Sequence, residues 1–365
     1  MSNRRTANIS EEASMLDRPP QPAPEQPPVA AGRSPQEYAA RVPAPIEQIL
    51  FEVKRLIVGQ DRLLERLLIA LLSGGHVLLE GVPGLAKTVT VKAFAQVIGG
   101  TPGRIQFTPD LVPADLVGTR IYNPSRGEFT TELGPVFCNL LLADEINRAP
   151  AKVQSALLEA MQERQVTIGK DTHPLPDPFV VLATENPIET DGTYPLPEAQ
   201  LDRFMLKVLV DYPSFSEEVV IVERITGPAI ELRRVLTLEQ LREMQQKVAQ
   251  IYVDPAVRKY AATLAFASRP GKVKGLEDMA PNIAFGASPR ASINMISAAR
   301  ALAFMRGRQY VLPHDVSEIA PEVLRHRIVL TYEGIAAGVT TESIVRRLLD
   351  AFPAPRIDLG DRFAS

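Results

Sequence analysis

The octapeptide Gly81-Val82-Pro83-Gly84-Leu85-Ala86-Lys87-Thr88 decides the fold class of this chain. It follows an apolar run at residues 77–80 that predicts a short buried strand, and it precedes a helical pattern at residues 88–98. Glycine, lysine and threonine at this spacing between a strand and a helix are typical of a phosphate-binding loop, whose backbone N–H groups point at phosphate oxygens. Lys87 can then reach the outer phosphates, and Thr88 can place its hydroxyl on Mg²⁺.

Ala86 departs from the usual pattern of such a loop, which has a second glycine at this position. Alanine is small, and a residue that already lies in the first helical turn does not need a positive φ. If Ala86 lies in that turn, alanine is tolerated there, and we expect the motif to be little affected. The alternative interpretation of the octapeptide is a plain strand–turn–helix corner with an exposed lysine.

A second apolar run ends in two carboxylates, in Leu140-Leu-Leu-Ala-Asp-Glu145. Ligands bind at the carboxyl ends of the strands in an open parallel sheet, and the loop at residues 81–88 also follows such an end. We expect Asp144 to hold Mg²⁺ through water, and Glu145 to orient or deprotonate the attacking water. The alternative is a pair of acids that only caps the next helix, and it weakens when Lys87 and Thr88 are considered together with them.

Three further polar residues could act on a phosphate. Asn186 ends another predicted strand, where it could bond the attacking water or be an ordinary turn residue. Arg203 could stabilise charge on a transferred phosphoryl group, or it could pair with Asp202 at the surface. Arg290 lies in the first turn of a helix capped by Ser288, where the helix dipole disfavours a cation. An anionic partner such as a phosphate would explain Arg290, and a solvated arginine is the alternative.

The chain divides into four segments by pattern. Strands alternate with helices over residues 44–213, which predicts a parallel sheet covered by helices on both faces. The strand signal then fades, so we expect a smaller all-helical domain at residues 214–332 and a C-terminal extension at residues 333–365. Residues 1–43 are rich in proline and poor in large apolar side chains, which predicts a disordered tail.

Composition sets limits on the function. The 40 Lys and Arg residues nearly balance the 43 Asp and Glu residues, and the net charge of −3 gives no bulk attraction to nucleic acid. The single cysteine, Cys138, lies in an apolar stretch and is expected to be buried. No apolar run approaches the roughly 18 residues of a membrane span, and the polar start lacks a signal-peptide core, so we expect a cytoplasmic protein. The four histidines show no metal-ligand spacing.

Six segments together resemble the AAA+ ATPases, and specifically the MoxR family. They are Ile57-Val-Gly-Gln60, Leu79-Glu-Gly-Val-Pro-Gly-Leu-Ala-Lys-Thr88, Asp144-Glu-Ile-Asn-Arg-Ala-Pro150, Leu157-Leu-Glu-Ala-Met-Gln-Glu163, Thr193-Tyr-Pro-Leu-Pro-Glu-Ala-Gln-Leu-Asp-Arg-Phe204 and Ala287-Ser-Pro-Arg-Ala291. The resemblance covers about residues 46–332, and Ala86 is no oddity within the family. It implies an α/β fold, an AAA+ P-loop parallel sheet in an αβα sandwich with a smaller helical lid domain, and ATP with Mg²⁺ as cofactors.

The resemblance also implies roles for individual residues. The nucleotide would be bound by Val58, Gly59, Gly81, Val82, Pro83, Gly84, Leu85, Ala86, Lys87, Thr88 and Val89. Lys87 and Thr88 would form the Walker A pair, Asp144 and Glu145 the Walker B pair, and Thr88 and Asp144 would hold Mg²⁺. Asn186 would be sensor 1 and Arg290 sensor 2. Arg203 would be the finger that acts on a neighbouring subunit's nucleotide, with Arg148 as the alternative finger.

The family resemblance implies ATP hydrolysis in a homo-oligomeric ring, expected to be a hexamer, that remodels or matures partner protein complexes. A separate protein with a von Willebrand A domain is one expected partner. Hairpins expected at residues 119–132 and 165–175 would face the pore or the client. They carry three basic and three acidic residues, Arg120, Arg126, Lys170, Glu128, Glu132 and Asp171, and this balance argues against the alternative of a nucleic-acid motor. A non-hydrolysing nucleotide-gated scaffold is the other alternative, and the intact Glu145 argues against it.

Overall fold

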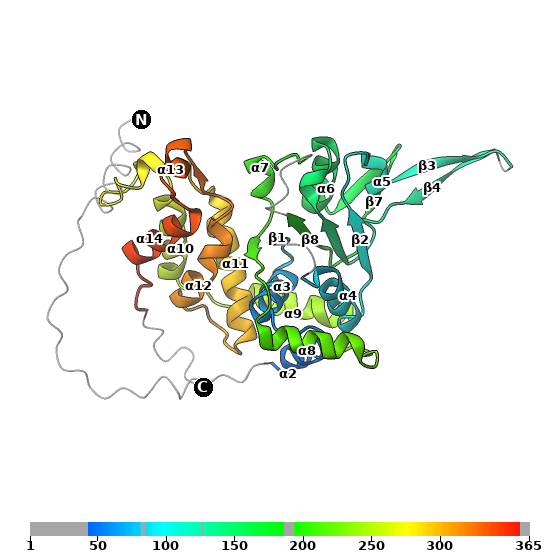
Figure 1. Ribbon diagram of the computed structural model, residues 1–365, viewed down its shortest axis with the longest axis horizontal. Helices are drawn as coiled ribbons and strands as arrows, with labels where there is room; N and C mark the ends of the chain where they lie inside the picture. Colours follow the sequence, from blue (N-terminus) through cyan, green and yellow to red (C-terminus); the bar gives the residue numbers. More distant parts are fainter. Residues whose placement is uncertain (1–42, 82–84, 126, 186–192, 358–365) are drawn as a thin grey trace, which may run out of the picture.

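The computed structural model describes residues 43–81, 85–125, 127–185 and 193–357. Its strands are β1 Val77–Glu80, β2 Pro102–Gln106, β3 Gly118–Asn123, β4 Glu128–Leu133, β5 Leu140–Asp144, β6 Gln165–Ile168, β7 Asp171–Pro174, β8 Val180–Glu185, β9 Leu206–Leu209, β10 Ile283–Phe285 and β11 Val329–Leu330. Its helices are α2 Ala44–Lys54, α3 Asp61–Ser73, α4 Lys87–Val97, α5 Pro113–Val117, α6 Ala151–Glu163, α7 Glu198–Leu201, α8 Phe215–Thr226, α9 Leu238–Gln250, α10 Pro255–Ala267, α11 Pro289–Met305, α12 Pro313–Leu324, α13 Tyr332–Ala336 and α14 Thr341–Ala351. Figure 1 shows a sheet domain beside a group of helices, α10 to α14.

The central sheet confirms the parallel sheet that the sequence predicts. Its five strands run parallel in the order β2-β5-β8-β1-β9. The register pairs Glu80 with Glu185 and Gln106 with Asp144, so that the polar residues at the strand ends stand side by side. These four side chains lie at one edge of the sheet because every strand points the same way.

The sheet separates two apolar cores, as expected for strands that are buried on both faces. Alternate residues of β1 point to opposite sides: Val77 and Leu79 pack with helices α2, α3 and α4, whereas Leu78 packs with α6. The first core continues without a break into the helical lid, where Met295 and Leu302 of α11 are fully buried. Burial of the strand faces therefore fixes both the sheet and the position of the lid against it.

The lid is helical, as predicted, and it also holds a short antiparallel pair, β10–β11, that the sequence reading missed. Helix α9 lies between the two bodies, because Gln245 donates to the Leu71 carbonyl of α3 at 2.6 Å and α9 also contacts α11. Arg224 of α8 donates at 2.7 Å to the Lys54 carbonyl of α2. Helices α8 and α9 thus pack against the sheet domain, and the predicted domain boundary near residue 213 stays a prediction.

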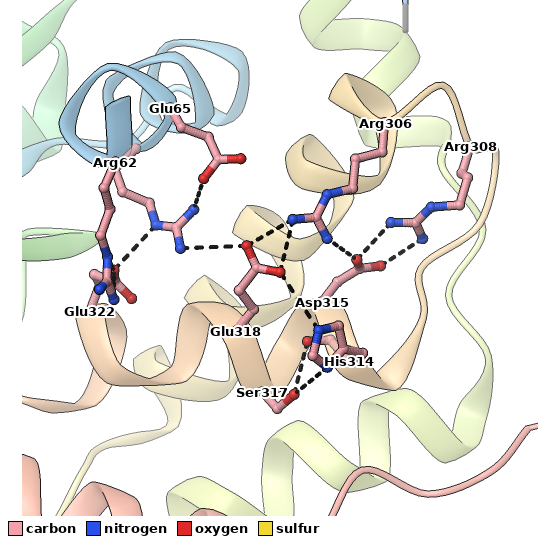
Figure 2. A network of polar contacts seen from close by, with 10 residues as sticks. Arg62, Glu65, Arg306, Arg308, His314, Asp315, Ser317, Glu318 and Glu322 are labelled. Carbon is pink, nitrogen blue, oxygen red and sulfur yellow. Dashed lines mark hydrogen bonds and ion pairs between the residues drawn. The ribbon is translucent and has the colours of Figure 1, made fainter. Parts of the chain in front are cut away.

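A chain of ion pairs crosses from α3 of the sheet domain to α12 of the lid (Figure 2). Glu322 is fully buried, and its Oε1 accepts from Arg62 Nε at 2.7 Å and from Arg66 Nε at 3.3 Å. Arg66, itself buried, also reaches Glu318, whose carboxylate is held by Arg306 at 2.8 Å. The lid therefore meets the sheet domain through buried charges as well as apolar packing.

The two hairpins that the sequence predicts are confirmed as the pairs β3–β4 and β6–β7. The β3–β4 ribbon projects from the sheet domain on the side away from the lid (Figure 1). Tyr122 and Phe129 pair across it with ring centroids 5.1 Å apart, and Arg120 lies over the Phe129 ring. Both aromatic side chains are more than half exposed, at 52% and 59%. The ribbon thus presents aromatic surface to its surroundings.

Two smaller predictions can be compared with the structure. Cys138 is buried, as expected, and this burial raises the pKa of its thiol to about 12. Within the part of the chain that is described, no helix combines the length and the apolar character that a bilayer crossing requires. The predicted tail at residues 1–43 lies outside the described residues, apart from Pro43.

Candidate functional site

A pocket of about 400 Å³ lies at the carboxyl edge of the sheet, where the ends of β1, β2, β5 and β8 meet the start of α4. Its lining residues are Gly81, Leu85, Ala86, Lys87, Thr88, Val89, Arg104, Gln106, Asp144, Glu145, Thr184 and Glu185. The two predicted motifs, separated by more than 50 residues in the sequence, therefore face one cavity. The alternative interpretation of the octapeptide was a plain strand–turn–helix corner with an exposed lysine. That alternative does not fit, because Lys87 is buried and lines the pocket.

Lys87 is buried, in the first turn of α4. Its Nζ donates to the Gly81 carbonyl at 2.8 Å, which turns the side chain back across the loop. Burial lowers the pKa of Lys87, and the carboxylates of Asp144 and Glu145 act in the opposite direction. Both acids line the same pocket as Lys87.

Gly81 needs to be glycine for steric reasons. A Cβ at this position would lie 2.5 Å from the carbonyl oxygen of Val210, at the end of the neighbouring β9. The loop therefore starts in close contact with the backbone beside it. This close approach is the reason why the motif begins with glycine in this chain.

Ala86 does not lie in the helical turn where alanine would need no positive φ. It precedes α4 as its N-cap residue, with φ 54° and ψ 18°, and it is not part of the first helical turn. An alanine pays about 1 kcal/mol or more for this left-handed conformation, because its Cβ approaches the following carbonyl. The loop is therefore formed against local strain at the position where the usual motif has glycine.

Asp144 and Glu145 are held by polar partners that sequence reasoning missed. Thr184 of β8 donates its hydroxyl to Asp144 Oδ1 at 2.8 Å and accepts from the Glu145 N–H at 2.8 Å. Arg104 donates to Asp144 Oδ2 at 2.9 Å, and Gln106 donates to Glu145 Oε2 at 3.0 Å. Thr184 and Gln106 lie at or next to the carboxyl ends of strands adjacent to β5, so the rule that located Asp144 could have located them as well, whereas Arg104 lies in the middle of β2.

The backbone of Glu145 lies in the left-handed region, with φ 56°. Its carboxylate also lies 3.3 Å from the Arg148 guanidinium of the same chain. The αL backbone turns the side chain into the pocket instead of along the strand. Strained backbone at such a position is typical of functional sites, because the surrounding structure must hold it in place.

A second charged cluster borders the pocket. Lys207 of β9 pairs with Glu80 at 2.5 Å and lies 3.8 Å from Glu185. Burial raises the pKa of Glu185, Lys207 opposes this shift and the Glu80 carboxylate adds to it. Lys207, the second residue of β9, thus contacts both acids at the carboxyl ends of β1 and β8.

The donor set suits Mg²⁺ bound to a phosphate ligand. The hydroxyl of Thr88 and the carboxylate of Asp144 line the same pocket. Among the residues described, no three His, Cys, Asp or Glu side chains gather into a metal-binding group. Mg²⁺ usually takes only one or two protein ligands and fills its remaining positions with water and phosphate oxygens, so a hydroxyl with one carboxylate is a sufficient set.

Several predicted site residues do not reach this pocket. Val58 and Gly59 do not line it, and Gly59 lies beside Glu217 of α8. Arg203 donates to Gln162 of α6 at 3.1 Å, and Arg290 lies 3.6 Å from Asp202. The remaining predicted positions, Val82, Pro83, Gly84 and Asn186, lie outside the described residues. The Walker A and Walker B residues therefore line one pocket, whereas Arg203 and Arg290 do not line it.

Comparisons with known proteins agree with this geometry. The AAA family, described as "ATPase family associated with various cellular activities", matches residues 76–206, and the AAA lid domain matches residues 277–348. The crystal structure of a candidate ATPase from Cytophaga hutchinsonii is similar with a TM-score of 0.81 and 46% identity, covering 86% of this chain and 95% of that one.

Relatives of known sequence extend over most of the chain. Protein MoxR of Methylorubrum extorquens is 31% identical over 331 residues, with 83% of this chain and 93% of that protein covered. Chaperone MoxR1 of Mycobacterium tuberculosis is 54% identical over 337 residues, which cover 92% of this chain and 88% of that protein. With the phosphate loop and the acidic pair facing one pocket at the edge of an αβα sheet, this chain belongs to the MoxR family of AAA+ ATPases.

Proposed function

We propose that this chain hydrolyses ATP with Mg²⁺, acting in the cytoplasm as a homo-oligomeric ring of six subunits. The observation that carries the proposal is the shared pocket of Lys87, Thr88, Asp144 and Glu145. A buried lysine beside two carboxylates and a helix N-terminus offers the donors and the metal ligands that a bound triphosphate requires. Mg²⁺, when bound, would neutralise charge on the phosphates.

In this proposal each residue of the pocket has one task. Lys87 binds the outer phosphates, while Thr88 and Asp144 hold the metal. Glu145 orients the attacking water and accepts its proton, and Gln106 fixes the orientation of that carboxylate through its bond at 3.0 Å. Asn186 is assigned to the terminal phosphate or the water by resemblance alone. Val58 and Gly59 are assigned to the adenine in the same way.

The finger residue is proposed to be Arg203. It is partly exposed and its Nε contacts only Gln162 among the bonds found for it, so it could reach a neighbouring subunit. Arg148, the alternative, already lies 3.3 Å from Glu145 of its own chain. This contact favours a role for Arg148 within its own subunit, and hydrolysis would then depend on assembly through Arg203.

The client is proposed to be a protein complex. The relative from Mycobacterium tuberculosis is named a chaperone, and the β3–β4 ribbon presents an exposed aromatic pair, Tyr122 and Phe129. Exposed aromatic surface on a projecting element is typical of protein contact sites. We also propose a separate protein with a von Willebrand A domain as a partner. This proposal rests on the family resemblance alone.

The experiment is ATP turnover by the Glu145→Gln variant, with Glu159→Gln on the exposed face of α6 as the matched control. We expect Glu145→Gln to bind ATP normally but to lose at least about 100-fold in turnover, because the water loses its proton acceptor. Arg203→Ala should also bind ATP without turnover, and mixing the two variants should restore part of the activity. Near wild-type turnover by Glu145→Gln contradicts the assigned chemistry, and absence of rescue in mixed rings contradicts a finger that acts between subunits.

A further inference from the structure

Asp202 is a meeting point of the sheet domain and the lid. It follows α7 directly, its side chain is 17% exposed, and both of its carboxylate oxygens contact residues of the lid. Arg327 donates from Nε to Oδ1 at 2.7 Å. On the other oxygen, Ser288 donates its hydroxyl to Oδ2 at 2.9 Å, and Arg290 Nη1 lies 3.6 Å away. The two oxygens therefore serve different contacts.

The Oδ1 side is a structural clamp. Arg327 is buried, and it also donates to the Asp202 carbonyl at 3.1 Å, to the Phe204 carbonyl at 2.6 Å and to the Met205 carbonyl at 3.3 Å. These bonds tie the segment that leads into β9 to the end of α12. Burial lowers the pKa of Arg327, while its bond to Asp202 opposes this shift. The arginine stays charged at any physiological pH because its ordinary pKa is so high.

The Oδ2 side involves the start of α11. Ser288 is the N-cap of this helix, and its Oγ accepts from the Arg290 N–H at 3.1 Å while it donates to Asp202. A cation in the first turn of a helix is disfavoured by the helix dipole, so the position of Arg290 calls for a nearby anion. Asp202 supplies that anion from within the chain. Arg290 is half exposed and does not line the phosphate pocket.

We propose that Asp202 is a positioning residue that competes with the nucleotide phosphates for Arg290. This inference rests on the proposed ATP-binding function and on the sensor 2 role that the family resemblance implies for Arg290, in which its guanidinium contacts a phosphate. Arg290 does not line the phosphate pocket, so its guanidinium has to move away from Oδ2 to reach a phosphate there, whereas the clamp on Oδ1 remains. Asp202 thereby sets nucleotide affinity through the lid, and it does so one residue before the proposed finger Arg203.

The test is a double-mutant cycle read as the Kd of a fluorescent, non-hydrolysable ATP analogue. Asp202→Asn keeps an oxygen that can accept from Arg327, but it removes the charge that holds Arg290. We expect the Kd to fall by about two- to fivefold, the range of a half-exposed ion pair. In an Arg290→Ala background, the same Asp202→Asn change should leave the Kd unaltered. A merely structural role of Asp202 would give equal effects in both backgrounds.

An unchanged or higher Kd for Asp202→Asn overturns the inference, and so does an equal fall in the Arg290→Ala background. Lys87→Ala separates this failure from failure of the proposed function. If Lys87→Ala abolishes binding while the cycle shows no coupling, only the role of Asp202 is wrong. If Lys87→Ala binds the analogue as tightly as the unaltered chain, the phosphate site itself is wrong.

A second measurement applies if Asp202→Asn does not fold. Amide hydrogen exchange of the unaltered chain, with and without saturating analogue, reports on the peptides that span residues 198–205 and 287–292. We expect the analogue to speed exchange at both, since the ion pair between Arg290 and Asp202 breaks when Arg290 contacts a phosphate. Arg290→Ala should remove this response. No nucleotide-dependent change in the unaltered chain would overturn the inference.

Discussion

The phosphate pocket and the lid interface are both built from charged residues, but they use them in opposite ways. In the pocket, Lys87, Asp144 and Glu145 line a cavity that a ligand can enter. In the interface, Arg327 and Glu322 are buried, with side chains that are 1% and 0% exposed, and they pair within the chain. The first arrangement leaves charge available for a ligand, whereas the second uses charge to hold two bodies together.

The backbone differs between the two regions as well. Ala86 and Glu145 border the pocket and both adopt positive φ, at 54° and 56°. Asp202 and Arg327, at the interface, are not among the residues of positive φ found in the described chain. Of the four non-glycine residues with positive φ in the described chain, these two line the pocket, whereas Gln60 and Arg164 do not, so left-handed backbone occurs at the pocket without being confined to it. The variants below test this difference, from the largest expected effect to the smallest.

Arg327→Ala should give the largest effect on stability. It leaves the Asp202 charge and several backbone carbonyls without their donor, and breaking a buried pair in this way costs about 3–5 kcal/mol. The free energy of unfolding, from urea titration followed by circular dichroism, measures the loss. Arg347→Ala is the control, because Arg347 is half exposed and lies 3.8 Å from Asp278. We expect a change below about 1 kcal/mol there. Equal effects of both variants would contradict the contrast between interface and surface.

Lys87→Ala should act on binding instead of stability. We expect a loss of detectable ATP binding, about 100-fold or more, because charge-assisted bonds to the phosphates disappear. The fold should tolerate the change, since within the described residues the Lys87 side chain donates its hydrogen bond to the Gly81 carbonyl and to no other group. Titration with a fluorescent nucleotide measures it, and Lys92→Ala on the exposed face of α4 is the matched control. Tight ATP binding by the Lys87→Ala variant would contradict the assignment of this pocket as the phosphate-binding site.

The interface should also make stability depend on pH through His326. Burial lowers the pKa of His326 well below its ordinary value of 6.5, with the Arg327 charge adding to the shift. The native state then keeps this histidine neutral while the unfolded state binds a proton below its ordinary pKa. Stability is therefore fully present above pH 6.5 and is lost as the pH falls, by up to about 1.4 kcal/mol per pH unit.

His326→Gln should reduce this loss, because an amide can still donate to the Phe204 carbonyl but does not titrate. The melting temperature at about pH 7.5 and about pH 5.5 measures it, and the drop between them should shrink. His314→Gln, at an exposed position on α12, is the control and should leave the drop unchanged. An unaltered drop for His326→Gln would show that another group causes the pH dependence.

Ala86→Gly should change the free energy of unfolding least, and it should increase it. Glycine adopts φ 54° without the Cβ contact, so we expect the variant to be more stable by about 1 kcal/mol. Ala262→Gly, at an exposed position inside α10 of the lid, is the same substitution in helical backbone. It should destabilise the chain by about 1 kcal/mol. Two changes of the same sign in melting temperature would contradict strain at the loop.

Much of the fold could be predicted from periodicity and loop chemistry. The five strands of the sheet and both hairpins appear where the pattern places them, because buried parallel strands and Gly-containing turns have distinct local signatures. The pair β10–β11 was missed, since three residues and two residues are too short to show a period. The conformation of Ala86 could not be predicted, because the loop and not alanine's own preference sets its φ.

By itself, the sequence determined the family, the parallel sheet and the four residues Lys87, Thr88, Asp144 and Glu145 at the phosphate pocket, since each of these depends on short segments with strong local rules. Only the tertiary structure decided which polar partners hold Asp144 and Glu145, and which anion stands beside Arg290. Thr184, Arg104 and Asp202 reach these positions through strand order and lid packing. Contacts of that kind join residues tens to about a hundred positions apart, and no local preference encodes them.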